Sequence, residues 1–225
     1  MATQEPLTAV PAAQQASSSE SESESVALVS LNDEEARTVE AIAERIIPGD
    51  DNNAGATDAG VVYYIDQAIG GFSTDLQTVY RRGLRELDVL CRRESGGPFT
   101  DLPPEVQDDV VRRHLGPEVQ ESTEGLQFSP ADQPGGAILR RFFAVVREHT
   151  VEGFFCDPVY GGNRGTVGWR LVGFPGAHWG YTAKEMAAGF DGRSVPIKTL
   201  SDLRRELKDL PPNDVFTRND PNTER

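Results

Sequence analysis

Four side chains that could carry acid–base chemistry lie near one another in the chain: His149, Asp157, Tyr160 and Arg164. Histidine exchanges protons near neutral pH, aspartate can act as a general base, tyrosine can donate a proton, and arginine stabilises developing negative charge. One hypothesis is therefore a stand-alone enzyme with its site near these residues. A metal site formed by His149, Glu152 and Asp157 is a second hypothesis. The simpler interpretation of His149 is a histidine near a helix C-terminus that interacts with the last carbonyls.

Known catalytic motifs do not include these residues. The other two histidines, His114 and His178, lie far from His149, and the chain has no HExxH motif and no glycine-flanked serine of the hydrolase type. It also lacks GxGxxG and GxxxxGK[ST], so we expect it to bind no dinucleotide by itself. We therefore predict no catalytic residue, no cofactor and no metal in this chain.

The segment 151–176 surrounds three of these four side chains and is the most distinctive part of the sequence. It is rich in glycine, proline and aromatic residues, in an order that predicts one specific loop rather than a helix or a strand. Gly161 and Gly162 allow a positive φ or a close approach to another surface, while Pro158 and Pro175 stiffen the flanks. Such loops usually serve recognition.

Asn163 and Arg164 are expected to project polar groups from this rigid loop, and aromatic residues beside an arginine are typical of interface hot spots. The alternative is a structural loop, in which the aromatics fill the core and Arg164 binds backbone carbonyls. The candidate partner-binding residues are Phe154, Phe155, Asp157, Tyr160, Gly161, Gly162, Asn163, Arg164, Trp169 and Phe174.

Helical periodicity predicts the elements that position this segment. Asn32 with Glu35 forms a capping box, and the helix that follows ends at residues 48–49. Further apolar stripes predict helices before residues 70–71, up to residues 96–97, from Pro103, and from Ile138 to about Thr150. The predicted inward side chains of this fifth helix are Leu139, Phe142, Phe143 and Val146. The expected fold is all-α, an irregular multi-helix bundle with a long ordered loop and a disordered N-terminal tail.

The acidic turn at residues 50–55 has no glutamate at the twelfth position, which excludes an EF-hand calcium loop. We expect its Asp and Asn side chains to form turn hydrogen bonds and to cap the next helix.

Three regions are predicted along the chain. Residues 1–27 are an acidic Ser/Glu tail too polar to fold, residues 28–180 a helical domain, and residues 181–225 a C-terminal extension with short helices. In the extension, Thr182 and Glu185 form a capping box, and a leucine stripe from Leu200 to Leu210 is either a docking arm or a helix packed on its own domain.

Charge and cysteine content narrow the function. The 22 basic and 36 acidic residues give a net charge of −14, so we expect no nucleic-acid partner. There is no apolar run of bilayer length and no signal peptide, from which we expect no membrane insertion and a cytoplasmic location. Two cysteines, Cys91 and Cys156, exclude a CxxC site but leave one disulfide possible.

Three passages resemble the gluconate 2-dehydrogenase subunit 3 family: AIAERIIPGD (41–50) with Gly55 and Ala56, GLRELD (83–88), and EGFF (152–155) through DPVYGGNR (157–164) to GW (168–169) and GFPG (173–176). The resemblance covers about residues 31–180.

This resemblance implies a non-catalytic accessory subunit. Its partner would be a large FAD-dependent dehydrogenase of the glucose-methanol-choline class that oxidises sugars, sugar acids or polyols. The small subunit would stabilise its partner, with a chaperone role, and FAD would belong to the large chain. Many members are exported through a twin-arginine signal, which this sequence lacks. A third hypothesis is a helical interaction protein with another partner.

Overall fold

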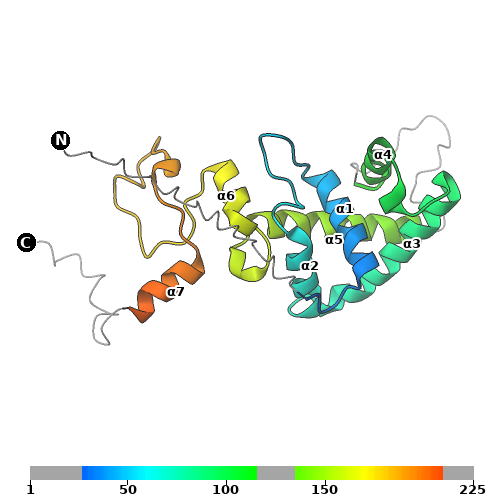
Figure 1. Cartoon of the computed structure of the whole chain (residues 1–225), viewed down its shortest axis with the longest axis horizontal. Coiled ribbons are helices and arrows are strands. Elements are labelled where there is room, and N and C mark those ends of the chain that lie inside the picture. Colours follow the sequence, from blue (N-terminus) through cyan, green and yellow to red (C-terminus); the bar gives the residue numbers. More distant parts are fainter. Residues whose placement is uncertain (1–26, 116–134, 210–225) are drawn as a thin grey trace, which may run out of the picture.

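The computed structural model describes residues 27–115 and 135–209, which contain seven α-helices and no strand (Figure 1). The all-α prediction is confirmed. The expected disorder of residues 1–27 falls outside the described residues, apart from Ala27. The helices are α1 (Asp33–Ile46), α2 (Val61–Gly70), α3 (Gln77–Ser95), α4 (Pro104–Leu115), α5 (Gly136–Phe155), α6 (Val167–Val172) and α7 (Leu200–Lys208).

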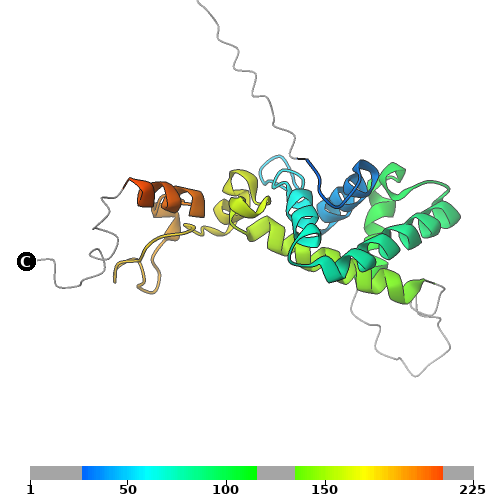
Figure 2. The ribbon, with the colours of Figure 1, turned by 90° about the horizontal axis from the view of Figure 1, so that it is seen from below.

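Helix α5 is the axis of the helical body, and α1, α2, α3 and α4 all contact it (Figures 1 and 2). The side chains predicted to face inward, Leu139, Phe142, Phe143 and Val146, are buried. Helix α3 approaches α5 closely because Gly83 has no side chain: a Cβ at this position would lie 2.1 Å from Cγ of Phe142. The core is therefore apolar packing around one central helix.

Local signals in the sequence set several helix ends. The capping box of α1 is present: Asn32 Oδ1 accepts hydrogen bonds from the backbone N–H groups of Glu34 and Glu35, and the Glu35 carboxylate accepts from Asn32 N. Helix α3 ends at Gly96, whose φ of +80° suits glycine. Both boundaries agree with the prediction.

The loop between α1 and α2 forms the predicted turn but not the predicted cap. Asp50 Oδ1 accepts hydrogen bonds from Asn52 N at 2.7 Å and Asn53 N at 2.8 Å. The cap prediction was wrong because the chain makes a further turn, with Gly60 N donating to Thr57 O, before α2 begins. Gly60 itself takes the N-cap position at φ +65°, without a side-chain cap bond.

A buried carboxylate holds the first described residues against α2. Asp66 is 1% exposed, and its oxygens accept hydrogen bonds from the backbone N–H groups of Val29, Ser30 and Leu31 at 2.7–2.9 Å. Three such bonds satisfy a carboxylate that burial would otherwise destabilise.

The segment 151–176 is more helical than predicted. Helix α5 continues past Thr150 to Phe155, and α6 occupies Val167–Val172, so only residues 156–166 and 173–176 of this segment lie outside the α-helices. Gly153 lets α2 pack closely against the last turns of α5: a Cβ there would lie 2.9 Å from Tyr64. Helix α5 ends before Pro158, since a residue that precedes proline disfavours helical geometry, and Asp157 is extended with ψ 137°.

The C-terminal extension lies beyond α6, at the end of the molecule that carries α7 (Figure 1). It is joined to residues 175–177 by backbone hydrogen bonds from Ala177 N to Lys198 O and from Lys198 N to Pro175 O. Thr182 and Glu185 exchange the bonds of a capping box, but turns follow instead of the helix that such a box usually starts.

Helix α7 begins with a capping box of its own and buries Leu203. Leu207 on the same stripe is 37% exposed, and Leu210 falls outside the described residues. Across residues 27–115 and 135–209, no helix combines the length and the apolar character of a membrane span.

Candidate functional site

Asn163 is the structural centre of the loop between α5 and α6. It is fully buried at φ +45°, its Nδ2 donates to Cys156 O at 2.8 Å, and its Oδ1 accepts from Gly168 N at 2.9 Å. One amide therefore connects the C-terminal end of α5 to the first turn of α6. The prediction that Asn163 projects a polar group from the loop was wrong, because its side chain satisfies the backbone groups that the tight loop leaves unpaired.

The two glycines perform the two roles predicted for them. Gly161 has a φ of +97°, a conformation that side chains rarely adopt. Gly162 lies against the end of α5, where a Cβ would come within 2.1 Å of Gly153 O. The loop is thus pressed onto the helix that precedes it.

Arg164 is anchored by its backbone and leaves its charged group exposed. Its backbone N donates to Ala59 O at 2.9 Å, and its guanidinium lies over the Tyr63 ring, 3.8 Å from the centroid. Gly60 leaves room for this side chain, since a Cβ there would lie 2.6 Å from Cδ of Arg164. Instead of binding carbonyls, the guanidinium makes a cation–π contact between the α5–α6 loop and α2.

The positive charge of Arg164 also reaches Glu40 on α1. Burial of Glu40 and the nearby Glu44 carboxylate raise the pKa of Glu40, and Arg164 partly opposes this rise. Glu40 lies beside a hollow lined by Tyr63, so the Arg164 contact forms part of a wider polar surface between α1 and α2.

Asp157 is buried and acts as a cap. Its Oδ1 accepts from Val159 N at 3.0 Å, and its Oδ2 accepts from Leu200 N, the first residue of α7, at 2.7 Å. One carboxylate therefore fixes both the turn after α5 and the start of α7. These two hydrogen bonds give a structural role to Asp157, which the sequence analysis considered as a catalytic residue and as a metal ligand.

Of the aromatic candidates, two are buried and three are exposed. Phe154 is 1% and Trp169 5% exposed, and Trp169 Nε1 donates to Phe155 O at 2.7 Å. Phe174 packs edge-on against Trp169 and is 46% exposed, while Phe155 and Tyr160 are exposed as well. Phe154, Asp157, Gly162, Asn163 and Trp169 thus hold the site in shape, and only the exposed candidates are available to a partner.

Exposed apolar side chains concentrate in this part of the described chain. Of fourteen large apolar side chains exposed among the described residues, nine lie between residues 151 and 181. We call these nine the apolar surface. Its members are Val151, Phe155, Val159, Tyr160, Leu171, Val172, Phe174, Trp179 and Tyr181.

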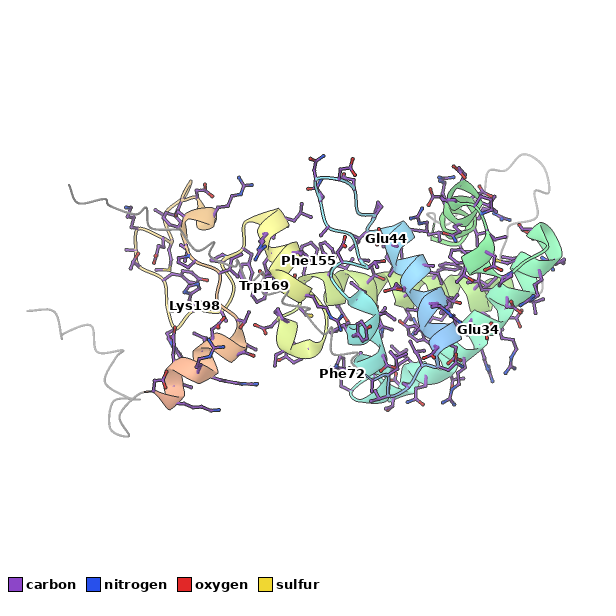
Figure 3. All side chains as sticks on the ribbon, viewed as in Figure 1. Glu34, Glu44, Phe72, Phe155, Trp169 and Lys198 are labelled. Atoms are coloured by element: carbon purple, nitrogen blue, oxygen red, sulfur yellow. The ribbon has the colours of Figure 1, made fainter. Side chains whose placement is uncertain are left out.

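Phe155, one of these nine, and Trp169 lie where the α1–α5 helices meet the C-terminal extension (Figure 3). Scattered exposed apolar residues are ordinary, whereas contiguous exposed apolar patches are a feature of contact sites. Six of its members were not among the predicted residues: Val151, Val159, Leu171, Val172, Trp179 and Tyr181. They follow no helical stripe in the sequence, so only the structure shows that they face solvent.

The proposed catalytic residues do not form one site. His149 is buried on α5, stacks on the Tyr80 ring, and shares a 3.0 Å hydrogen bond through Nδ1 with the Tyr80 hydroxyl. Burial lowers the pKa of His149, against the opposing effect of Glu152 and Glu148. Asp157 is bonded to backbone N–H groups in another part of the structure, and Tyr160 is exposed. The arrangement gives no support to a stand-alone enzyme at these residues.

Residues that the sequence marked only as helix interior form a polar cluster around His149. Tyr64 donates to Glu152 Oε2 at 2.8 Å, and its ring meets that of His149 edge-on. Burial, and then the hydrogen bond to Glu152, raise the pKa of Tyr64. Burial is also the main cause of the raised pKa of Tyr80. Each hydroxyl has a partner inside the fold, so we read the cluster as core structure.

The proposed metal ligands also have separate partners. His149 is bonded to Tyr80, Glu152 to Tyr64, and Asp157 to two backbone N–H groups, and no group of three potential ligands occurs among the described residues.

Cys91 and Cys156 are free thiols. Burial raises the pKa of each to about 11. The disulfide that the sequence allowed is therefore not formed.

Comparison with known proteins decides the family. A family model described as gluconate 2-dehydrogenase subunit 3 matches residues 33–176, from the start of α1 to the end of the loop after α6. The chain belongs to the gluconate 2-dehydrogenase subunit 3 family. The resemblance drawn from the sequence is confirmed, and the family is that of a subunit of a dehydrogenase complex. No curated protein and no solved structure matched the chain.

Proposed function

We propose that this gluconate 2-dehydrogenase subunit 3 family protein is a non-catalytic accessory subunit. Its partner is a large FAD-dependent dehydrogenase of the glucose-methanol-choline class that acts on sugars, sugar acids or polyols. The chain binds this partner, stabilises it and assists its folding. FAD and the catalytic groups belong to the partner.

The concentration of exposed apolar side chains in the apolar surface carries this proposal. Nine large apolar groups face solvent on a segment held by Asn163, Asp157 and Trp169. A rigid surface loses little conformational entropy on binding, which favours affinity. The family match supports a dehydrogenase as the partner.

Exposed aromatic residues should dominate the binding energy. We expect Tyr160→Ala and Phe174→Ala each to weaken binding of the flavin subunit by about 2 kcal/mol, or roughly thirtyfold in Kd, as is typical of interface anchors. Both side chains are about half exposed, so the melting temperature of the isolated chain should barely change. Val89→Ala is the matched control, because Val89 is 53% exposed on α3, outside the apolar surface.

The measurement is a binding titration of purified chain against the co-expressed flavin subunit, with a melting curve for each variant. Unchanged Kd values for Tyr160→Ala and Phe174→Ala would place the interface elsewhere. Capture of the chain by a protein without flavin, and failure to bind the flavin subunit, would instead support a helical interaction protein with another partner.

The catalytic part of the proposal has a separate test. The chain purified alone should show no flavin absorbance and no sugar oxidation, and co-expression should raise the yield of soluble, flavin-loaded partner. Turnover of a sugar or sugar acid by the isolated chain would refute the accessory role and restore the enzyme hypothesis.

A further inference from the structure

A second site lies outside the apolar surface, in an open surface hollow of about 530 Å³ between α1, α4 and α5. We call it the arginine pocket. Three arginines from three helices line it: Arg45 near the end of α1, Arg112 on α4 and Arg147 on α5. Its other lining residues are Ile46, Pro48, Asp108 and Val111.

The charge of the arginine pocket is opposite to that of the whole chain. Its three arginines face one lining carboxylate, Asp108, in a protein with a net charge of −14. The pairing is weak as well: Arg45 Nη1 lies 3.7 Å from Asp108 Oδ1, and Arg112 lies 3.8 Å from the exposed Asp109. The pocket is therefore positive by about two charges.

The guanidinium of Arg45 also carries a hydrogen-bond donor, Nε, that lacks an acceptor among the described residues. This Nε is buried, although the side chain as a whole is 22% exposed. A buried donor without an acceptor is unfavourable, and a guanidinium fork matches a carboxylate through two parallel hydrogen bonds. The apolar residues Ile46, Pro48 and Val111 would lie against the carbon atoms of the same ligand.

We propose that the arginine pocket binds a carboxylate that Arg45, Arg112 and Arg147 hold together. Its volume is in the range of small-molecule sites. The carboxylate comes either from a free organic acid or from an acidic side chain of a partner protein, and both sources share this recognition chemistry.

Succinate is a suitable probe, and butane-1,4-diol is its neutral counterpart. We expect millimolar succinate to shift the side-chain Nε–Hε resonance of Arg45 in ¹H–¹⁵N spectra of the full chain, and the diol to leave it unmoved. Arg147→Ala should weaken this response about tenfold or more, because it removes one of three charge-assisted contacts. Arg141→Ala is the matched control, since Arg141 is also exposed on α5 but lies outside the pocket.

A second measurement separates the two sources of the carboxylate. If the ligand is an acidic side chain of the flavin subunit, Arg112→Ala with Arg147→Ala should raise the Kd of the complex about tenfold, and succinate should compete with the partner. If the ligand is a free acid, succinate should bind to the chain, while neither the double variant nor added succinate should change the Kd of the complex. The proposal would be overturned if succinate left the Arg45 Nε–Hε resonance unshifted and the double variant also left the Kd of the complex unchanged. The spectra need no partner, so they stand even if the proposed function fails.

Discussion

Replacement of Asn163 by alanine should destabilise the protein, because its side-chain amide bonds to two backbone groups of the loop. The change removes the acceptor for the buried Gly168 N–H and the donor to Cys156 O. An orphaned buried donor costs about 1–3 kcal/mol. The carbonyl is only partly buried, so water can replace its partner. Alanine at φ +45° adds about 1 kcal/mol, because the left-handed region crowds its Cβ.

The free energy of unfolding should therefore fall by about 2–4 kcal/mol in Asn163→Ala. For a chain of this length, that corresponds to a decrease in melting temperature of roughly 5–15 °C. Differential scanning calorimetry of the isolated chain gives both quantities. Asn163→Gly is the informative companion, since it loses the same hydrogen bonds while glycine tolerates the positive φ. It should be less destabilised than the alanine variant by about 1 kcal/mol.

Two results would contradict this explanation. A loss below about 0.5 kcal/mol in the alanine variant would mean that the amide does not connect α5 to α6 as described, since such a loss is ordinary for surface positions. A glycine variant less stable than the alanine variant would mean that the backbone of residue 163 is not left-handed in solution.

Three further predictions concern other parts of the fold. Gly162→Val should prevent folding or lower the melting temperature severely, because its Cβ would lie 2.1 Å from a backbone carbonyl at the end of α5; a normal melting curve would refute the packing. Cys91 and Cys156 should react with iodoacetamide far more slowly than an exposed thiol at about pH 8, because a pKa of about 11 leaves little thiolate. The alkylation rates of the native and the unfolded protein measure this difference, and equal rates would contradict the prediction. Burial lowers the folded-state pKa of His149 and His114 below the ordinary histidine value, so the unfolded chain binds more protons than the folded one. The free energy of unfolding should therefore fall as pH decreases from about 7 to about 5.5. Melting temperatures that rise as pH decreases over this window would refute the prediction.

Features with a local cause were predictable from the sequence. The box between Asn32 and Glu35 spans one helical turn, the stop of α3 at Gly96 needs only glycine at a positive φ, and the turn at Asp50 involves neighbours two and three residues away. Apolar stripes gave the inward faces in the same way, because the helical period alone decides which side chains share a face. Gly161 and Gly162 were also recognised, because a glycine pair inside a loop by itself indicates a positive φ or a close backbone approach.

What escaped prediction depends on contacts between distant residues. Asp66 was not singled out in the sequence, because the N–H groups that it binds lie 35–37 positions earlier in the chain. Asp157 looked like a candidate for chemistry, yet it caps a helix 43 positions later. Glycine at position 153 argues against a helix in the sequence, and only the structure shows that Tyr64 packs against α5 where a side chain would stand.

The hydrogen bond from Leu200 N to Asp157 has a consequence for where this protein can be divided. The family match ends at residue 176, yet Asp157 lies before that boundary and its bonded donor lies after it. A chain cut at residue 176 would leave Oδ2 of Asp157 without its donor, Leu200 N. It would also remove Lys198 N, the backbone donor to Pro175 O. The hydrogen bonds of the segment shared with the family therefore extend beyond that segment. A relative that ends near position 176 would need another way to satisfy the aspartate at this position.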